Sequence, residues 1–458
     1  MKSADKKALR PPLGQLIIYA FGQFGWALAS FSAINLLLYF YMPPENGNAA
    51  VFPPYIFQGA ILGIATVIGL VNFGGRLFDG LTDPLIANWS DKANSNFGKR
   101  KKFMGIAALP VAVFSFLIFY PLTEVAGILN TIWLVGTILL FYFFLTLYVV
   151  PYTALISELG HHQKDRMLIS TLISVTFALA YVLGNGAYAI QQSLEETMNS
   201  TEAFQTTIGT FSLIAFAFML MPVLFLKENK YCYQTTSNFE VIKSVKSVFQ
   251  NVSFRYFLCS DLTYWLSLTF IQLGVSYYTI SLFGLEKEMI TVFSTVGFGV
   301  SFLLYAPINF LVNKFGKKAV LSTAFWAFSL TFLLTFLIPI LPVDKMTLFY
   351  FIAIFSGYPL ACFGIIPNAI IADVVHQDEQ KTGVQQAGMF YGVRNFMMKM
   401  GVSIATLIFP SLLLLGKSEE NTMGVQATAL VAVFFCIVGF LFFRHYEESS
   451  DFSNDDMK

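Results

Sequence analysis

Three ionisable side chains interrupt an apolar stretch in the first quarter of the chain. Arg76, Asp79 and Asp83 lie within a run from about 56 to 90 that is long enough to cross a bilayer. Their spacings of three and four residues place them on one face of a helix. Ionised groups at membrane depth are costly unless they face protein or water. Two carboxylates and one guanidinium leave a net negative charge that a mobile cation can neutralise.

Hydroxyl groups complete this pattern. Counting ~1.5 Å of helix rise per residue from the polar helix ends places Thr146 level with Asp79, both ~18 Å from the cytoplasmic edge. Thr82 lies beside Asp83, and hard cations prefer oxygen ligands. We therefore predict a Na⁺ or H⁺ site formed by Asp79, Asp83, Thr82 and Thr146.

Two bases are predicted to couple this site to transport. Arg76 lies on the same helix as the two aspartates, and Lys399 lies at a similar depth in a later apolar run, where it would compete with the cation for the carboxylates. The alternative is a static salt-bridge cluster that pins the two helices together. We favour the functional interpretation, because a purely structural buried ion pair stabilises a fold weakly for its desolvation cost.

Further polar and aromatic residues are candidates for the solute and for a cytoplasmic gate. The predicted solute-contacting residues are Arg394, Trp26, Asn35, Tyr264 and Gln272. The predicted gate residues are Asp91, Lys99, Arg100 and Asp373. Core packing is favoured for the aromatic members. The basic cluster 99–102 is mainly a positive-inside anchor, and a closing latch with Asp91 is its second interpretation.

The elements that must position these residues are membrane helices. The chain has 458 residues, of which 56% are hydrophobic and 12% are charged. Apolar runs long enough to span the hydrocarbon core recur throughout. We predict an all-α membrane protein with twelve transmembrane helices, at roughly 14–41, 56–90, 103–122, 127–157, 167–191, 206–226, 254–283, 290–313, 318–340, 346–372, 384–415 and 422–444.

Basic residues set the orientation. With the N-terminus in the cytoplasm, 22 of the 28 Lys and Arg residues fall on the cytoplasmic side and three on the outside. We therefore expect a multi-pass protein of the plasma (cytoplasmic) membrane with both termini in the cytoplasm. Because the first apolar run lacks a cleavage-site pattern, we expect no cleaved signal peptide.

An internal repeat divides the chain. Phe97-Gly98-Lys99 recurs as Phe315-Gly316-Lys317 at an offset of 218, and Pro151 recurs as Pro367 within a similar motif at an offset of 216. We expect six-helix bundles over 1–226 and 254–446, a cytoplasmic linker over 227–253 and a disordered tail over 447–458. Two bundles related by a pseudo-twofold axis resemble the major facilitator superfamily.

Other function classes find no support in the sequence. It shows no Gly-rich phosphate loop, nucleophile elbow or HExxH motif, so we expect no enzyme and no cofactor beyond a co-transported ion. The net charge of +1 gives no reason to expect a nucleic-acid partner. The expected partners are a small-molecule solute and membrane lipid, and we expect a monomer to be functional.

Two motifs resemble those of a known transporter family. The stretch Arg76-Leu-Phe-Asp79-Gly-Leu-Thr-Asp83-Pro84, followed by Ser90-Asp91 and Gly98-Lys-Arg, resembles the helix-2 signature of the glycoside–pentoside–hexuronide:cation symporters. A second motif, Ala372-Asp373 … Lys381-Thr382-Gly383 … Lys399-Met-Gly401, resembles the signature that bridges helices 10 and 11. The resemblance implies that Asp79, Asp83, Thr82 and Thr146 hold the cation and that Lys399 is the coupling lysine.

The resemblance implies cation-coupled symport by alternating access, by family default of a sugar, glycoside or uronide. The acidic, aromatic and basic positions of that sugar site fall here on Ala27, Val149, Thr153 and Ser174. Because these side chains cannot grip a polyol as carboxylates do, an anionic or amphiphilic solute such as a lysolipid is the alternative, with Arg394 and Lys399 as its positive charges. The alternative from another class is a non-coupled lipid scramblase or a sensor.

Overall fold

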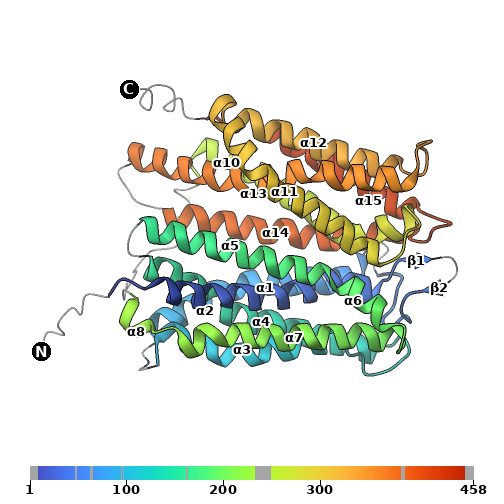
Figure 1. The fold of residues 1–458 in the computed structure, drawn as a ribbon, viewed down its shortest axis with the longest axis horizontal. Helices are drawn as coiled ribbons and strands as arrows, with labels where there is room; N and C mark the ends of the chain where they lie inside the picture. Colours follow the sequence, from blue (N-terminus) through green and yellow to red (C-terminus); the bar gives the residue numbers. More distant parts are fainter. Residues whose placement is uncertain are drawn as a thin grey trace, which may run out of the picture. The chain divides into compact units, whose positions relative to one another are not determined.

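A computed structural model describes residues 9–46, 49–61, 65–93, 95, 97–160, 163–232, 249–382 and 387–448. The long elements of this part of the chain are all helices (Figure 1). The first half contains α1 (Leu13–Tyr41), α2 (Val67–Lys92), α3 (Lys99–Leu117), α4 (Ile128–Leu159), α5 (Gln163–Asn185), α6 (Ala187–Leu194), α7 (Ser200–Phe225) and the short α8 (Glu228–Tyr231). The second half contains α10 (Val252–Tyr277), the π-helix η1 (Tyr278–Leu282), α11 (Glu288–Phe315), α12 (Lys317–Leu337), α13 (Lys345–Thr382), α14 (Ala387–Leu413) and α15 (Met423–Phe443).

Each predicted apolar run coincides with one of these long helices, with α5 and α6 sharing the fifth run and α10 and η1 the seventh. Within the described residues, nine helices are long and apolar enough to cross a membrane by length and composition. The exceptions are α2, which carries several charges, α3, which begins with four basic residues, and α10, which is rich in Ser, Thr and Tyr. The prediction of an all-α membrane fold is confirmed.

The start of α2 differs from the prediction. The apolar run begins near residue 56, but the helix begins at Val67. Before it, β3 (Ala60–Ile61) pairs antiparallel with β4 (Ala65–Thr66). Thr66 then caps the helix, its side chain accepting a hydrogen bond from the backbone N–H of Gly69 at 3.1 Å. A capping residue, and not hydrophobicity, therefore sets the helix start. Another pair of short strands, β1 (Glu45–Asn46) and β2 (Ala49–Ala50), follows α1.

The chain divides into two compact units. The first comprises Met1–Pro43 and Ala50–Asn238, and the second comprises Pro44–Ala49 and Phe239–Lys458. In the first, α1 packs on α5 and α7, while α4 packs on α2 and α3. In the second, α10 packs on α14 and α15, while α13 packs on α11 and α12. The same order of helix pairings therefore occurs in both units, as the sequence repeat predicts.

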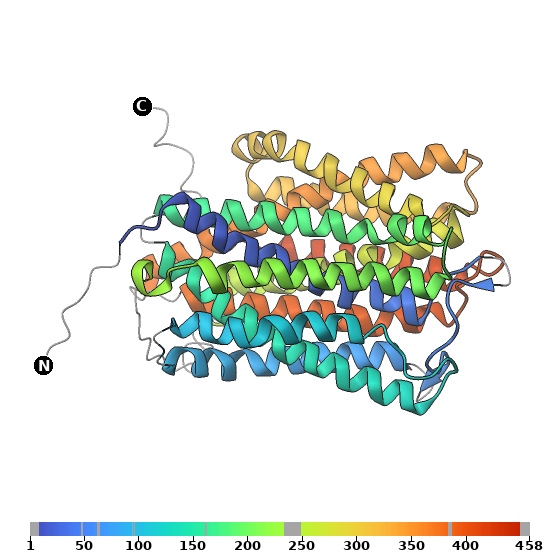
Figure 2. The same cartoon turned by 60° about the horizontal axis from the view of Figure 1, so that its bottom comes forward.

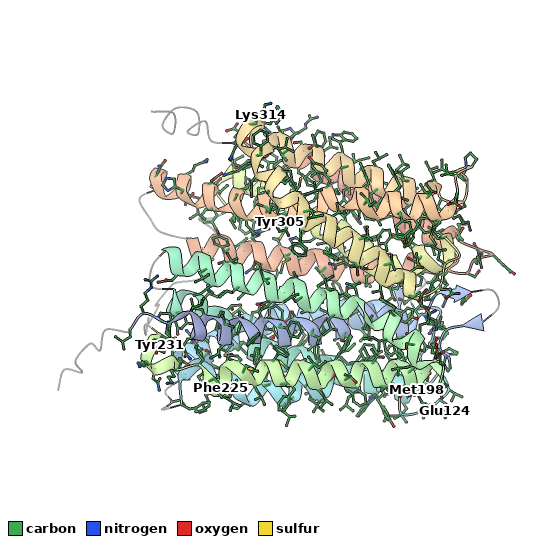
Figure 3. All side chains as sticks on the ribbon, in the orientation of Figure 1. Glu124, Met198, Phe225, Tyr231, Tyr305 and Lys314 are labelled. Atoms are coloured by element: carbon green, nitrogen blue, oxygen red, sulfur yellow. The ribbon has the colours of Figure 1, made fainter. Side chains whose placement is uncertain are left out.

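Small residues bring α1 close to its neighbours in the first unit. A Cβ atom at Gly25 would lie 2.6 Å from the carbonyl oxygen of Ala215 on α7, and one at Gly22 would lie 2.8 Å from the ring of Tyr152 on α4. The glycines of α1 thus serve close packing. The helices of this unit run alongside one another in both ribbon views (Figures 1 and 2). Figure 3 shows Phe225 and Tyr231 toward one end of the unit and Glu124 and Met198 toward the other.

The repeated FGK motif builds the same turn in both units. Gly98 and Gly316 adopt φ values of 111° and 84°, which favour glycine, and each precedes a helix. The Glu228 carboxylate accepts the backbone N–H groups of Arg100 (3.0 Å) and Lys101 (2.9 Å) at the start of α3.

In the second unit, the Glu448 carboxylate accepts the backbone N–H groups of Lys317 (2.7 Å) and Lys318 (3.1 Å) at the start of α12. Glu448 falls in the stretch 447–458 that the sequence suggests to be a disordered tail, and this contact ties it to the second unit. Residues 449–458 lie outside the described residues, as do residues 233–248 of the predicted linker.

Candidate functional site

Helices α2 and α4 bring two of the predicted cation ligands together. The Thr146 hydroxyl lies 2.5 Å from Oδ1 of Asp79 and 2.9 Å from the carbonyl oxygen of Tyr142. Asp79 is 4% exposed and Thr146 is 1% exposed, so the contact is buried inside the first unit. A buried carboxylate beside a hydroxyl is the donor set that a hard cation prefers.

The next turn of α2 adds further oxygen atoms. Asp83 is half-buried and follows Asp79 by four residues, on the same helix face. Thr82 is buried, and its hydroxyl donates to the backbone carbonyl of Asp79 at 3.0 Å. Because Pro84 inside α2 has no N–H group, the carbonyl of Gly80 loses its usual helical donor. This turn of the helix is therefore rich in acceptor oxygens.

Arg76 lies close to Asp79 without a tight ion pair. Its Nη1 atom is 3.9 Å from Oδ2 of Asp79, longer than the 2.7–2.9 Å typical of a charge-assisted hydrogen bond. Its Cζ atom lies 5.3 Å from the ring centroid of Tyr142 on α4. Among the described residues, neither Nε of Arg76 nor the hydroxyl of Tyr142 has a hydrogen-bond partner, although both atoms are buried.

A second charged cluster lies within the second unit. The Arg394 guanidinium of α14 donates from Nε to Oδ2 of Asp261 on α10 at 3.0 Å and from Nη2 to Oδ1 at 3.1 Å. Its Nη1 donates to Oδ1 of Asn368 on α13 at 2.7 Å. The Asp261 side chain is 1% exposed and that of Arg394 is 11% exposed. Three helices are thus joined by a two-pronged ion pair and an amide.

This cluster changes the interpretation of Arg394. The sequence suggests a positive charge offered to an anionic solute, but the bidentate contact with Asp261 neutralises that charge inside the unit. Lys399 lies half-buried on α14, and its carbonyl accepts from the hydroxyl of Ser403 at 2.8 Å. The coupling of Lys399 to Asp79 and Asp83 stays a prediction.

The remaining predicted solute residues lie inside their units to different degrees. Tyr264 of α10 is 5% exposed and stacks on the ring of Phe363 at a centroid distance of 4.0 Å, as core packing requires. Asn35 is 9% exposed, while Trp26 and Gln272 are partly exposed. The indole N–H of Trp26 is buried and has no hydrogen-bond partner among the described residues, so it keeps an unused donor.

The predicted gate residues of the first unit bind within that unit. Arg100 is 4% exposed and donates from Nε (3.0 Å) and Nη2 (2.7 Å) to Oε1 of Glu158, and from Nη1 to the Ser90 hydroxyl. Lys99 lies 3.7 Å from the same Oε1 atom. Arg100 is therefore buried against an acidic side chain at the end of α4, and its role as a positive-inside anchor or as part of a latch stays a prediction. Asp91 lies in α2, but its side chain lies outside the described residues.

In the second unit, Asp373 of α13 forms an ion pair with Lys317 at the start of α12. In both units, an acid of the fourth long helix thus pairs with a base at the FGK turn. A gating role for these residues stays a prediction.

Burial changes the pKa of groups at this end of the first unit. Burial raises the pKa of Glu158, while Arg100 and Lys99 oppose that shift. Burial lowers the pKa of Lys101, against the attraction of Glu228. The Lys101 ammonium also donates to the carbonyl of Leu226 at 2.7 Å.

Several residues of these clusters are not predicted from the sequence. Asp261 is a single acidic residue in an apolar run. The same feature draws attention to Asp79, so Asp261 could have been predicted from the sequence in the same way. Glu228 and Glu448 each follow the last long helix of their unit, which the repeat could have revealed. Tyr142 and Asn368 carry no distinguishing signal in a chain with 21 Tyr residues and many polar helix positions.

The helical fold and the charges held within it define the class of protein, which is a multi-pass membrane transporter. A family described as "MFS/sugar transport protein" matches residues 18–445. The chain belongs to this family of major facilitator transporters. It is therefore a transporter of a small-molecule solute and not an enzyme.

Individual relatives agree with this assignment. The chain is 20% identical to "Putative glycoside/cation symporter YagG" of Escherichia coli (strain K12), with 85% of this chain and 84% of that protein covered. It is 21% identical to "Sodium-dependent lysophosphatidylcholine symporter 1" of Xenopus tropicalis, with 70% and 67% covered. Among solved structures, that of the nucleoside transporter NupG matches with a TM-score of 0.61 at 15% identity, covering 95% of this chain and 99% of that one.

Proposed function

We propose that this protein is a cation-coupled symporter that works by alternating access, with both termini in the cytoplasm. Asp79 and Asp83 bind Na⁺ or H⁺, and Thr82 and Thr146 supply hydroxyl oxygens. The observation that carries the proposal is the buried contact of Thr146 with Asp79, beside an arginine that stays 3.9 Å from the same carboxylate. A cluster built only for stability would bring Arg76 into closer contact, because a buried ion pair needs excellent geometry to offset its desolvation.

The solute is either a sugar-like molecule or an anionic or amphiphilic one. Relatives of both kinds match this chain at similar identity. The positions that carry the sugar-binding side chains in the family hold Ala27, Val149, Thr153 and Ser174 in this chain. The hydroxyl of Thr153 donates to the backbone carbonyl of Val150 (3.0 Å), and that of Ser174 donates to the carbonyl of Ser170 (2.8 Å).

Hydroxyls bonded to their own backbone grip a polyol less well than free carboxylates do. This favours the amphiphilic solute. The closed Arg394–Asp261 pair, in contrast, removes one reason to expect a strongly anionic solute.

Purified protein in detergent tests both parts of the proposal. Its melting temperature is measured in NaCl and in choline chloride of equal ionic strength, with a neutral disaccharide, a uronate or a lysolipid added. A solute that stabilises the protein only together with Na⁺ identifies the substrate class. Stabilisation by the disaccharide alone among the three would overturn the amphiphilic assignment.

The Asp83→Asn variant, reconstituted in liposomes, tests the coupling. We expect it to insert normally and to lose accumulation of the identified solute driven by a Na⁺ or H⁺ gradient. Unchanged gradient-driven accumulation would refute the assignment of Asp83. Lipid movement that ignores every gradient would favour the scramblase alternative.

A further inference from the structure

Tyr142 lies beside the proposed cation site although no motif marks it. It precedes Thr146 by one helical turn on α4, and its side chain is almost fully buried. Gly75 of α2 lies against its ring, so closely that a Cβ atom there would be 2.7 Å from the ring. This glycine lets α2 approach α4 at the level of Arg76. The ring is thus fixed by packing, next to the Arg76 guanidinium.

Arg76 lies between two attractive groups. On one side its Cζ atom is 5.3 Å from the Tyr142 ring centroid, within the range of a cation–π interaction. On the other side its Nη1 atom is 3.9 Å from Oδ2 of Asp79, beyond hydrogen-bond distance. Its Nε atom is buried and has no hydrogen-bond partner in the described part of the chain. The side chain therefore does not reach the two-pronged geometry that Arg394 attains with Asp261.

This position matters because Arg76 and a bound cation compete for the same carboxylate. A guanidinium in bidentate contact with Asp79 would fill the place of the cation and neutralise the charge that attracts it. A guanidinium held on an aromatic face still lowers the cost of burying acidic side chains nearby, yet leaves that place to the ion. The cation–π contact is a force that opposes collapse of Arg76 onto Asp79.

We propose that Tyr142 is a positioning residue that holds the Arg76 guanidinium away from Asp79 and thereby sets the affinity of the cation site. The inference rests on the proposed function, since it assigns Tyr142 a role at the same site. The aromatic ring is the active part. The buried hydroxyl of Tyr142 is not required for this role.

Na⁺ titrations of the melting temperature test the role of the ring. In Tyr142→Leu, Arg76 moves onto Asp79, and the Na⁺ concentration for half-maximal stabilisation rises about tenfold, the scale of a lost buried cation–π contact. Tyr142→Phe keeps the ring and responds as the wild type does. Adding Arg76→Gln to Tyr142→Leu removes the competitor and restores the response.

Phe144→Leu is the matched control, because Phe144 is a ring of the same helix that stacks on Phe114 of α3. It should leave the Na⁺ response unchanged. A Tyr142→Leu protein that responds to Na⁺ as the wild type does would overturn the proposal. Equal impairment of Tyr142→Phe would also overturn it, since the hydroxyl would then be the active group.

A double-mutant cycle measures the Arg76–Asp79 interaction in the absence of Na⁺. Melting temperatures in choline chloride are compared for Arg76→Gln, Asp79→Asn and the double variant, in both the wild-type and the Tyr142→Leu background. We expect the coupling between Arg76 and Asp79 to grow when the ring is removed. Unchanged coupling contradicts the positioning role even if Na⁺ binds, whereas increased coupling in a protein that no cation stabilises rejects the proposed function and keeps the positioning role.

Discussion

The two units pair the arginines of their apolar helices in opposite ways. In the first unit, Arg76 lies 3.9 Å from the nearest oxygen of Asp79 and rests against an aromatic ring. In the second unit, Arg394 makes two hydrogen bonds of 3.0 and 3.1 Å to Asp261 and a third to Asn368. The first arginine is held loosely, and the second is closely paired with its acid.

The difference indicates which of these two arginines can give way to a bound ion. A guanidinium whose hydrogen bonds are filled by a buried carboxylate is fixed in place, because breaking the pair strands a charge in the low-dielectric interior. A guanidinium held by a weaker aromatic contact can yield to an ion. We therefore propose the ion-binding role for the first cluster and a structural role for the second.

The largest predicted effect comes from breaking the closed pair. Asp261→Asn leaves Arg394 buried without its counter-ion, and we expect a loss of about 3–5 kcal/mol of stability, measured as a strong drop in melting temperature and in yield. The double variant Asp261→Leu/Arg394→Met should recover most of this loss. By contrast, Arg76→Gln should cost about 1–2 kcal/mol. If Arg76→Gln were as damaging as Asp261→Asn, the contrast between the two clusters would not hold.

A smaller effect is expected when the hydroxyl of the first cluster is removed. Thr146→Val leaves Oδ1 of Asp79 without this donor, at a cost of about 1–3 kcal/mol. The variant should also require more Na⁺ for the same rise in melting temperature. Thr406→Val on α14 is the control, because its hydroxyl bonds only to the Ser403 carbonyl within the described residues. Equal loss of Na⁺ response in both variants would point to general destabilisation instead.

The smallest effect is expected at the helix cap that occurs once in each unit. Glu228→Gln and Glu448→Gln each replace a carboxylate that accepts hydrogen bonds from two backbone N–H groups at a helix start by a neutral amide. We expect losses of about 0.5–2 kcal/mol for each. Melting temperatures of the two variants should fall by similar amounts. A much larger fall for one of them would show that the repeated turn does not serve both units alike.

Most of the fold can be predicted from the sequence because hydropathy and length alone locate membrane helices. The start of α2 cannot, because the cap at Thr66 decides it and not the apolar run that begins earlier. The contact of Asp79 with Thr146 can be anticipated, since counting helix rise from two polar ends places both at one depth. Counting residues along a helix gives the depth of a side chain but not the rotation of the helix about its axis. The sequence therefore does not reveal which side chains form hydrogen bonds with each guanidinium.

Two further differences have the same origin. The sequence suggests an unpaired charge at Arg394, because its partner Asp261 lies 133 residues away on a helix whose rotation the sequence does not specify. It also gives no sign that Arg100 is buried, with Glu158 and Ser90 contacting it from two other helices. Pairing across helices depends on side-chain packing, which composition and periodicity do not encode.

The most direct test of the account is the effect of cations on stability in the wild type and in Asp79→Asn. Melting temperatures are recorded against Na⁺ concentration at fixed pH, and against pH without Na⁺. We expect the wild type to be stabilised by one of these cations, by about 2.7 kcal/mol at a hundredfold excess over Kd, and Asp79→Asn to be stabilised by neither. An Asp79→Asn protein that keeps the wild-type response, or a wild type that ignores both cations, would contradict the account.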